Sequence, residues 1–224
     1  MSVVSFANPK GGAGKTTSAL VVAGALRHLG ASVTVIDADP MGWIARWSSI
    51  SPDNGLDVIS GVGRDSIVDE VEKASQRSHI VIVDLEGVAS VLATYAVALS
   101  DLVVTPIQPS SMDAEAGGEA FTMVQSQGKL QKRIIPHSVL FNRTSAAIMS
   151  RAHRAVKEQL ADAGVDTFTN SLVERAAFKE IFSFGGHLYD LDHEKVNGVI
   201  KAIENAEAVA QELLNKLGLG GDHG

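Results

Sequence analysis

A glycine-rich segment near the start of the chain limits what it can fold into. Residues 8–17 read N-P-K-G-G-A-G-K-T-T, directly after the apolar run 3–7 and before a helical pattern of apolar residues. Glycine has no Cβ, so its backbone can bring N–H groups close to an anion. The following helix adds unpaired N–H groups and a positive dipole end. A strand, such a loop and a helix in this order predict a phosphate-binding site.

The predicted phosphate ligands are consecutive residues of this loop. Lys15 can neutralise the β- and γ-phosphates of a nucleotide, and the Thr16 hydroxyl can bind Mg²⁺. The predicted nucleotide-binding residues of the loop are Gly11, Gly12, Ala13, Gly14, Lys15, Thr16 and Thr17.

One position departs from the standard loop, G-x-x-x-x-G-K-[ST]. Pro9 stands where the first glycine belongs, and an additional lysine, Lys10, precedes Gly11. The segment resembles the deviant Walker A motif, K-G-G-x-G-K-[ST]-T, of the ParA/MinD family of ATPases. That resemblance implies ATP as the substrate, Lys15 and Lys10 as catalytic lysines, and an ATP-dependent homodimer. Within such a dimer, Lys10 reaches across to the partner's nucleotide.

Three aspartates follow predicted strands. Asp37 and Asp39 come at the end of one strand, and Asp84 ends another. Ligands of such sheets bind beyond the carboxyl ends of the strands, and Mg²⁺ needs only one or two carboxylates besides phosphate oxygens. We therefore expect Thr16, Asp37 and Asp84 to hold Mg²⁺. Asp84 resembles the Walker B aspartate of the ParA/MinD family. Asp39 resembles the second aspartate of its D-x-D-P segment, which positions the attacking water.

Residues 142–145 read N-R-T-S after a later strand. Guanine-specific sites usually carry N-K-x-D at such a place, and the aspartate is missing here. Adenine is therefore the expected base, and Asn142 resembles the base-contacting asparagine of the ParA/MinD family. An asparagine that merely ends a strand in a turn fits this position equally well.

Strand-like apolar runs alternate with helical patterns along the chain. Such alternation is typical of βα units and a buried parallel sheet. We expect one α/β domain over residues 1–224, a doubly wound, mostly parallel sheet with helices on both faces, as in P-loop NTPases of the deviant Walker A type. The predicted strands are 3–7, 32–37, 79–84, 102–107 and 135–141, with weaker ones at 57–60 and 165–169. The predicted helices are 16–29, 66–77, 88–99, 114–127, 150–163 and 196–217.

Composition narrows the class of protein. The chain has no cysteine, which excludes disulfides and cysteine-ligated metal or iron–sulfur sites and agrees with a cytoplasmic location. Its start lacks the basic segment of a signal peptide, and no apolar run approaches the roughly 20 residues of a membrane helix. The outer face of the last predicted helix carries three glutamates, Glu204, Glu207 and Glu212, and two lysines, Lys201 and Lys216. A helix that binds a membrane surface is rich in lysine and arginine on that face, so we expect this helix to dock on the core.

A local basic patch is predicted within an acidic chain. The net charge of −7 argues against a globally basic nucleic-acid binder. Arg151, Arg154 and Lys157 nevertheless recur along one predicted helix, and Arg143 lies nearby in sequence. Resemblance to the ParA/MinD family implies non-specific DNA binding, for which a nucleotide-closed dimer presents six of these helix cations. A solvated helix face explains the same spacing.

The resemblance predicts a biological function. We expect an ATP-dependent dimerising switch ATPase that serves plasmid or chromosome partition, or the positioning of another cargo, together with a centromere-binding or cargo adaptor protein. An accessory ATPase of conjugative or T-DNA transfer is the main alternative. An ATP-dependent structural polymer and a metabolic kinase or ligase on the same fold are further alternatives.

Overall fold

The computed structural model describes residues 1–87, 90–146 and 149–220, in which strands and helices alternate. Its strands are β1 Ser2–Phe6, β2 Val33–Ala38, β3 Asp57–Ile59, β4 Ile80–Leu85, β5 Leu102–Ile107, β6 His137–Thr144, β7 Asp166–Thr167 and β8 Leu172–Val173. Its helices are α1 Lys15–His28, α2 Trp43–Ile50, α3 Ile67–Arg77, α4 Val91–Leu99, α5 Ser111–Gln131, α6 Arg151–Asp162, α7 Ala177–Phe184 and α8 Val199–Lys216. A short 3₁₀ turn at Leu188–Asp190 lies between α7 and α8.

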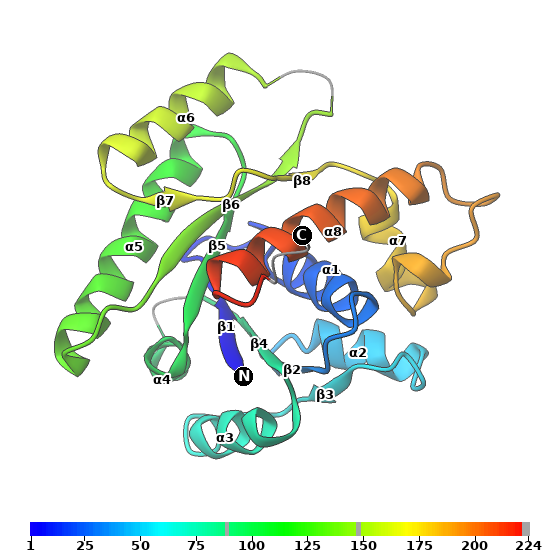
Figure 1. Cartoon of the computed structure of the whole chain (residues 1–224), viewed down its shortest axis with the longest axis horizontal. Coiled ribbons are helices and arrows are strands. Elements are labelled where there is room, and N and C mark those ends of the chain that lie inside the picture. The colour runs from blue at the N-terminus through cyan, green and yellow to red at the C-terminus, as the bar shows by residue number, and fades with distance from the viewer. Residues whose placement is uncertain (88–89, 147–148, 221–224) are drawn as a thin grey trace.

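The strands form one twisted sheet in the order β3-β2-β4-β1-β5-β6-β7, and β8 also pairs with β6 (Figure 1). Every pairing between them is parallel. The strand order reverses direction on either side of β1, as in other doubly wound folds. The predicted fold class is therefore confirmed.

Alternate residues of the central strands pack into apolar layers on opposite faces of the sheet. Val4 and Phe6 of β1 pack with α1, α2, α7 and α8 on one face of the sheet. Val3 and the β4 residues Val81 and Val83 pack with α3, α4 and α5 on the other. Because side chains of a strand point to opposite faces in turn, a strand covered on both faces must be apolar throughout. The near-continuous apolar runs of the sequence have this cause.

Helix α8 docks along α1 on one face of the sheet (Figure 1). Its buried residues include Ala202, Ala206 and Leu213, which belong to the same apolar layer as α1. Its docking on the core is therefore as predicted. No helix in the described part of the chain is long and apolar enough to span a membrane.

Several element boundaries differ from the predictions. Helix α5 is longer than predicted at both ends. Its N-terminus starts early because the Ser110 side chain accepts a hydrogen bond from the Asp113 amide. Helix α8 begins three residues later than predicted, after Gly198 in the left-handed region. Residues 88 and 89, the predicted start of another helix, lie outside the described residues, and α4 begins at Val91. The short elements α2, α7 and β8 were not predicted.

Candidate functional site

The loop between β1 and α1 has the shape of an anion cradle. The backbone of Gly12 (φ 73°) and Gly14 (φ 87°) lies in the left-handed region, which residues with a Cβ rarely adopt. A Cβ added at Gly11 or Gly12 would meet nothing within 4 Å, so the backbone there faces open space. The first turn of α1 has no acidic residue, and its free N–H groups remain available to an anion.

Lys15 lies at the base of this cradle and is only 7% exposed. Its Nζ donates to the Lys10 carbonyl over a long 3.4 Å. Burial lowers the pKa of Lys15, and the nearby carboxylates of Asp84, Asp39 and Glu86 act in the opposite direction. An ammonium group that is buried without a close ion pair gains most from a bound anion, such as a nucleotide phosphate.

The sheet register brings two of the predicted metal ligands together. Asp37 on β2 pairs directly with Asp84 on β4, at the carboxyl ends of neighbouring strands. Burial raises the pKa of Asp37, and it raises the pKa of Asp84 to about 7. Neither Asp84 oxygen, nor Oδ1 of Asp37, accepts a hydrogen bond from the described residues, although the neighbouring Thr16 hydroxyl partly offsets the Asp84 shift.

These unpaired buried oxygens fit a hard cation. Two carboxylates and the Thr16 hydroxyl are a small ligand set, and no group of three His, Cys, Asp or Glu side chains in the described ranges could hold a metal ion by itself. Mg²⁺ usually keeps several waters and takes substrate phosphates as ligands, so a small protein set at the mouth of a phosphate loop suits it.

Asp39 faces the same space as the loop. A cavity of about 440 Å³ is lined by the loop, by Asp39 and Met41 from the segment after β2, and by Glu86 and Phe182. The Asp39 Oδ1 atom accepts a hydrogen bond from the Met41 amide at 2.8 Å, which holds the carboxylate at the cavity wall. Asp39 therefore lines the same cavity as the loop, and its water-positioning function stays a prediction.

Lys10 is held away from the cradle. Its Nζ forms an ion pair of 3.0 Å with Asp113 in the first turn of α5, whose side chain is 3% exposed. The Lys10 side chain itself is 39% exposed, and its amide donates to Oδ1 of Asn8 at 2.7 Å. Lys10 therefore stands at the rim of the site, on the surface, and Lys15 alone occupies its base.

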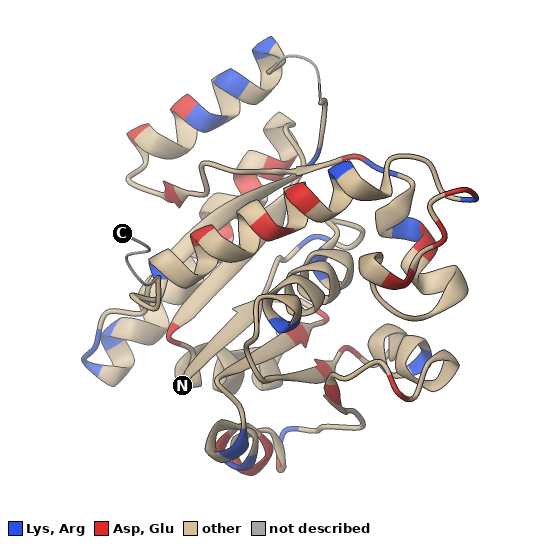
Figure 2. Cartoon of the chain, turned by 45° about the vertical axis from the view of Figure 1, so that its right-hand side comes forward, with Lys and Arg blue, Asp and Glu red and all other residues tan. Residues whose placement is uncertain are grey.

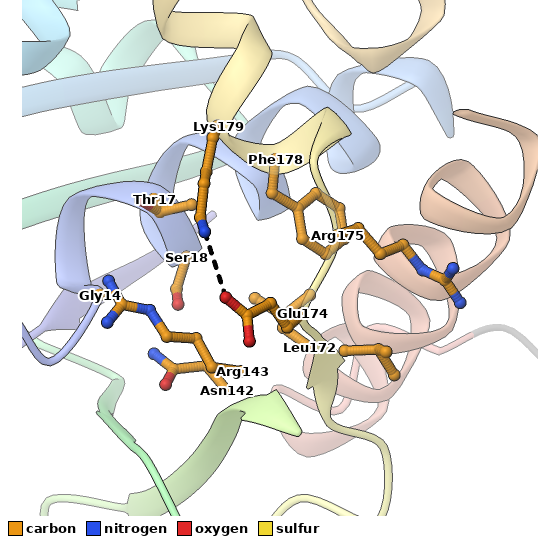
Figure 3. Close-up of a pocket in the computed structure, with 11 residues that line it drawn as sticks. Gly14, Thr17, Ser18, Asn142, Arg143, Leu172, Glu174, Arg175, Phe178 and Lys179 are labelled. Atoms are coloured by element: carbon orange, nitrogen blue, oxygen red, sulfur yellow. Dashed lines mark hydrogen bonds and ion pairs between the residues drawn. The ribbon is translucent and has the colours of Figure 1, made fainter. Parts of the chain in front are cut away.

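Asn142 contacts the loop from β6. Its Nδ2 donates to the Ala13 carbonyl, and a Cβ at Gly14 would lie 2.5 Å from that nitrogen. Gly14 is thus required twice, for its backbone conformation and for the close approach of Asn142. A second cavity, of about 50 Å³, opens beside this contact and is drawn in Figure 3. Contact between Asn142 and a base stays a prediction.

The comparisons with known proteins agree with this geometry. A family model described as VirC1 protein matches residues 1–218. A protein named ParA, from Rhizobium radiobacter, is 37% identical over 219 residues, which cover 97% of this chain and 98% of the relative. This chain belongs to the VirC1 family of ParA/MinD-type proteins. A second relative, maintenance of carboxysome distribution protein A of Halothiobacillus neapolitanus, is 28% identical over 84% of the chain and 87% of its own length.

Solved structures share the fold of this VirC1-family chain. MinD in the MinC:MinD cell division complex of Aquifex aeolicus matches with a TM-score of 0.75 at 17% identity, over 96% of each chain. Apo McdA of Cyanothece matches with a TM-score of 0.72 at 18% identity, over 92% of this chain and 99% of that one. Both have the predicted architecture. Together with the VirC1 family model and the ParA relative, they confirm the predicted resemblance to the ParA/MinD family.

The predicted DNA-binding cations of the VirC1-family chain lie apart from the loop, on α6. Arg151 and Arg154 are exposed and Lys157 is half-buried, while His153, Val156 and Leu160 of the same helix are buried. No ion pair joins the three cations to an acidic side chain in the part of the chain that the structure describes. Figure 2 shows these basic segments of α6 beside acidic ones further along the helix.

Six residues at this VirC1-family site were not predicted: Met41, Trp43, Glu86, Asp113, Arg143 and Phe182. Phe182 was missed because α7 was not predicted. Asp113 and Arg143 each follow a predicted strand by a few residues. Ligands of parallel sheets bind at the edge where strands end, so this position in the sequence could have indicated both residues as candidates. Glu86 lies two residues after Asp84 and would be found in the same way.

Proposed function

We propose that this chain is a Mg²⁺-dependent ATPase that switches between a monomer and an ATP-bound homodimer to partition DNA or position another cargo. One observation carries the proposal. The loop provides two lysines in different places, Lys15 buried at the base of the cradle and Lys10 half-buried at its rim with a side chain that is 39% exposed. A site that serves one protomer needs only the first of these lysines.

Each residue has a distinct part in the proposed reaction. Lys15 and the N–H groups of Gly11 to Thr17 bind the phosphates, and Mg²⁺ held by Thr16, Asp37 and Asp84 would neutralise their charge. Asp39 orients a water that attacks the γ-phosphorus, the bond to the β–γ bridging oxygen breaks, and ADP and phosphate are released. Positioning and charge stabilisation supply nearly all of the catalysis in such reactions.

Lys10 makes the site depend on a second copy. Its pairing with Asp113 keeps it on the surface beside the cavity. When two protomers close face to face, Lys10 exchanges this pair for the partner's phosphates, and hydrolysis removes the contact. The dimer is thereby tied to the presence of ATP.

The names of two relatives support a positioning function, which we propose takes place in the cytoplasm. The proteins most similar in sequence include one named for ParA and one named for maintaining the distribution of carboxysomes. We propose that the ATP-bound dimer sits on nucleoid DNA through α6 and that a centromere-binding or cargo adaptor protein triggers its release. The whole described fold acts as one ATPase domain.

A second candidate function is assistance to DNA transfer. The matching family model is VirC1, and two proteins named virC1, from Rhizobium rhizogenes and Rhizobium radiobacter, are each 25% identical to this chain. A neighbouring gene for a relaxase or a secretion component would favour transfer, and one for a centromere-binding protein would favour partition. Light scattering on addition of ATP tests the remaining alternative, a structural polymer.

Sedimentation of Lys10→Ala tests the proposed function. With a non-hydrolysable ATP analogue we expect the wild-type protein to dimerise and Lys10→Ala to bind the analogue as a monomer, since Lys15 and the loop backbone remain. Lys15→Ala is the comparison and should bind neither ATP nor ADP. A fully dimeric Lys10→Ala would remove the cross-subunit function from this lysine.

A further inference from the structure

Two cavities meet beside the phosphate loop. The larger one contains the loop, Asp39 and Glu86, and the smaller one lies between Asn142 and α7. Among the described residues, Gly14, Thr17 and Arg143 line both. We propose that Arg143 is a nucleotide-binding residue whose guanidinium contacts the α-phosphate. The inference rests on the proposed function, because it concerns the same nucleotide.

The position of the α-phosphate follows from the two cavities. A nucleotide whose β- and γ-phosphates lie in the loop, with its base in the smaller cavity, must cross the junction with its α-phosphate and ribose. Arg143 has the only charged side chain of the three described residues that line this junction. A guanidinium group presents a planar fork of donors that matches phosphate oxygens.

The backbone at Arg143 is arranged to direct this side chain. Its φ is 49°, in the left-handed region, which residues other than glycine, asparagine and aspartate seldom adopt. The preceding residue is anchored to the Ala13 carbonyl, so the end of β6 is fixed against the loop. From this turn the Arg143 side chain runs toward Gly14, whereas that of Arg175 points away from the cavity (Figure 3). Unfavourable backbone conformations of this kind gather at ligand sites.

The guanidinium also remains available to a ligand. Arg143 is exposed, and no hydrogen bond or ion pair engages its side chain within the described ranges of the chain. Glu174, the acidic residue among the described residues that line the smaller cavity, is paired with Lys179 at 3.1 Å. Both members of that pair are more than half exposed, so the pair separates at little cost when a base widens the cavity.

Calorimetric titration of Arg143→Asn with Mg²⁺-ADP and with a non-hydrolysable ATP analogue tests the proposal. Asparagine tolerates the left-handed region, so the variant removes the charge and keeps the turn. Loss of a hydrogen bond to a charged phosphate should raise the Kd for both nucleotides by the same factor, roughly 10- to 100-fold. The Kd for adenosine, which has no phosphate, should be unchanged when measured by competition. Arg143→Lys should recover part of the affinity for both nucleotides.

Arg64→Asn is the matched control, because Arg64 is also exposed and lies outside both cavities. An Arg143→Asn Kd within twofold of the wild-type value would overturn the inference. A loss of affinity for the ATP analogue alone would also overturn it, because it indicates a γ-phosphate contact. An equal loss of affinity for adenosine would overturn it as well, because it indicates a base contact. A wild-type protein that binds neither nucleotide would defeat the proposed function itself, whereas normal wild-type binding with an unaffected variant defeats only this inference.

Discussion

At the scale of single residues, the site separates groups by their burial. Lys15, Asp37 and Asp84 are at most 7% exposed, whereas Lys10 and Asp39 lie closer to solvent. Buried charges without close partners cost free energy in the empty protein, and a bound nucleotide with its cation removes that cost. The more exposed pair can meet a water molecule or a second protomer. Binding and hydrolysis should therefore respond to different substitutions.

Asp39→Ala should separate binding from hydrolysis. The variant keeps Lys15 and the whole loop, so we expect it to bind ATP and dimerise as the wild-type protein does. A water-positioning group contributes about 10²–10⁴ in rate, and phosphate release in steady state should fall by a factor in that range. Turnover within a few-fold of wild type would assign the water to another residue, with Asp37 the next candidate.

Asp84 should make the stability of the nucleotide-free protein depend on pH. Its pKa is raised to about 7 in the folded protein, from about 3.9 in an unfolded chain. The native state therefore binds more protons than the unfolded state between these values, and the stabilising contribution present at low pH is lost as the pH rises through about 7. Urea unfolding should show Asp84→Asn to be more stable than wild type at pH 8, with a smaller difference at pH 5. A difference independent of pH would contradict the shifted pKa.

At the scale of elements, α1 joins the site to the packing of the molecule. Its N-terminus forms the cradle, and its interior packs against α8 and against the segment before the 3₁₀ turn. Gly24 faces the buried ring of His187, whose Nε2 hydrogen-bonds to the Asn54 carbonyl at 2.8 Å. Trp47 of α2 lies against the same ring, so His187 cannot easily move.

Gly24→Ala should destabilise the protein for this reason. Alanine in a helix interior normally gains roughly 0.5–1 kcal/mol over glycine. Here the added Cβ would lie 2.7 Å from His187 Nδ1, and overpacking of this kind typically costs about 1–3 kcal/mol. We expect a net loss in the free energy of unfolding. A double-mutant cycle with His187→Ala is the control: in that background Gly24→Ala should become stabilising. The same loss in both backgrounds would show that His187 is not the cause.

At the scale of the whole molecule, charge is distributed unevenly. The chain carries a net charge of −7, yet α6 has basic segments that lie apart from the acidic stretch of α8 (Figure 2). The three cations of one protomer should bind nucleic acid only weakly. The proposed ATP-bound dimer would present six, and binding to a polyanion strengthens steeply with the number of cations. We therefore expect the oligomeric state to control whether this acidic protein binds DNA.

DNA binding should require ATP and should be sensitive to salt. Six phosphate contacts give a slope of about −5 in log K against log salt concentration, or roughly a 10³-fold loss between 50 and 200 mM. The measurement is a titration on random-sequence duplex with a non-hydrolysable ATP analogue and with ADP. Arg151→Glu/Arg154→Glu should abolish the difference between the two nucleotides. Equal affinity in both for the wild-type protein would exclude control by the dimer, and an unaffected charge reversal would place the DNA elsewhere on the surface.

Local sequence determined the cradle and the sheet. The glycines at 12 and 14 allow a backbone that other residues rarely adopt, and apolar runs of strand length are recognisable because a strand covered on both faces has no polar side. The short helix α7 left no comparable signal, since its eight residues span little more than two helical turns.

Only the tertiary structure decided how the site is completed. Asp37 meets Asp84 because the parallel register of β2 and β4 aligns them. Lys10 meets Asp113 across 103 positions of sequence, and Asn142 meets Ala13 across 129. The sequence predicted that Asp37, Asp84 and Asn142 follow strands of one sheet, but the contacts that these residues and Lys10 make depend on strand order, register and helix docking. Those are set by the packing of both apolar layers at once, and no local pattern records it.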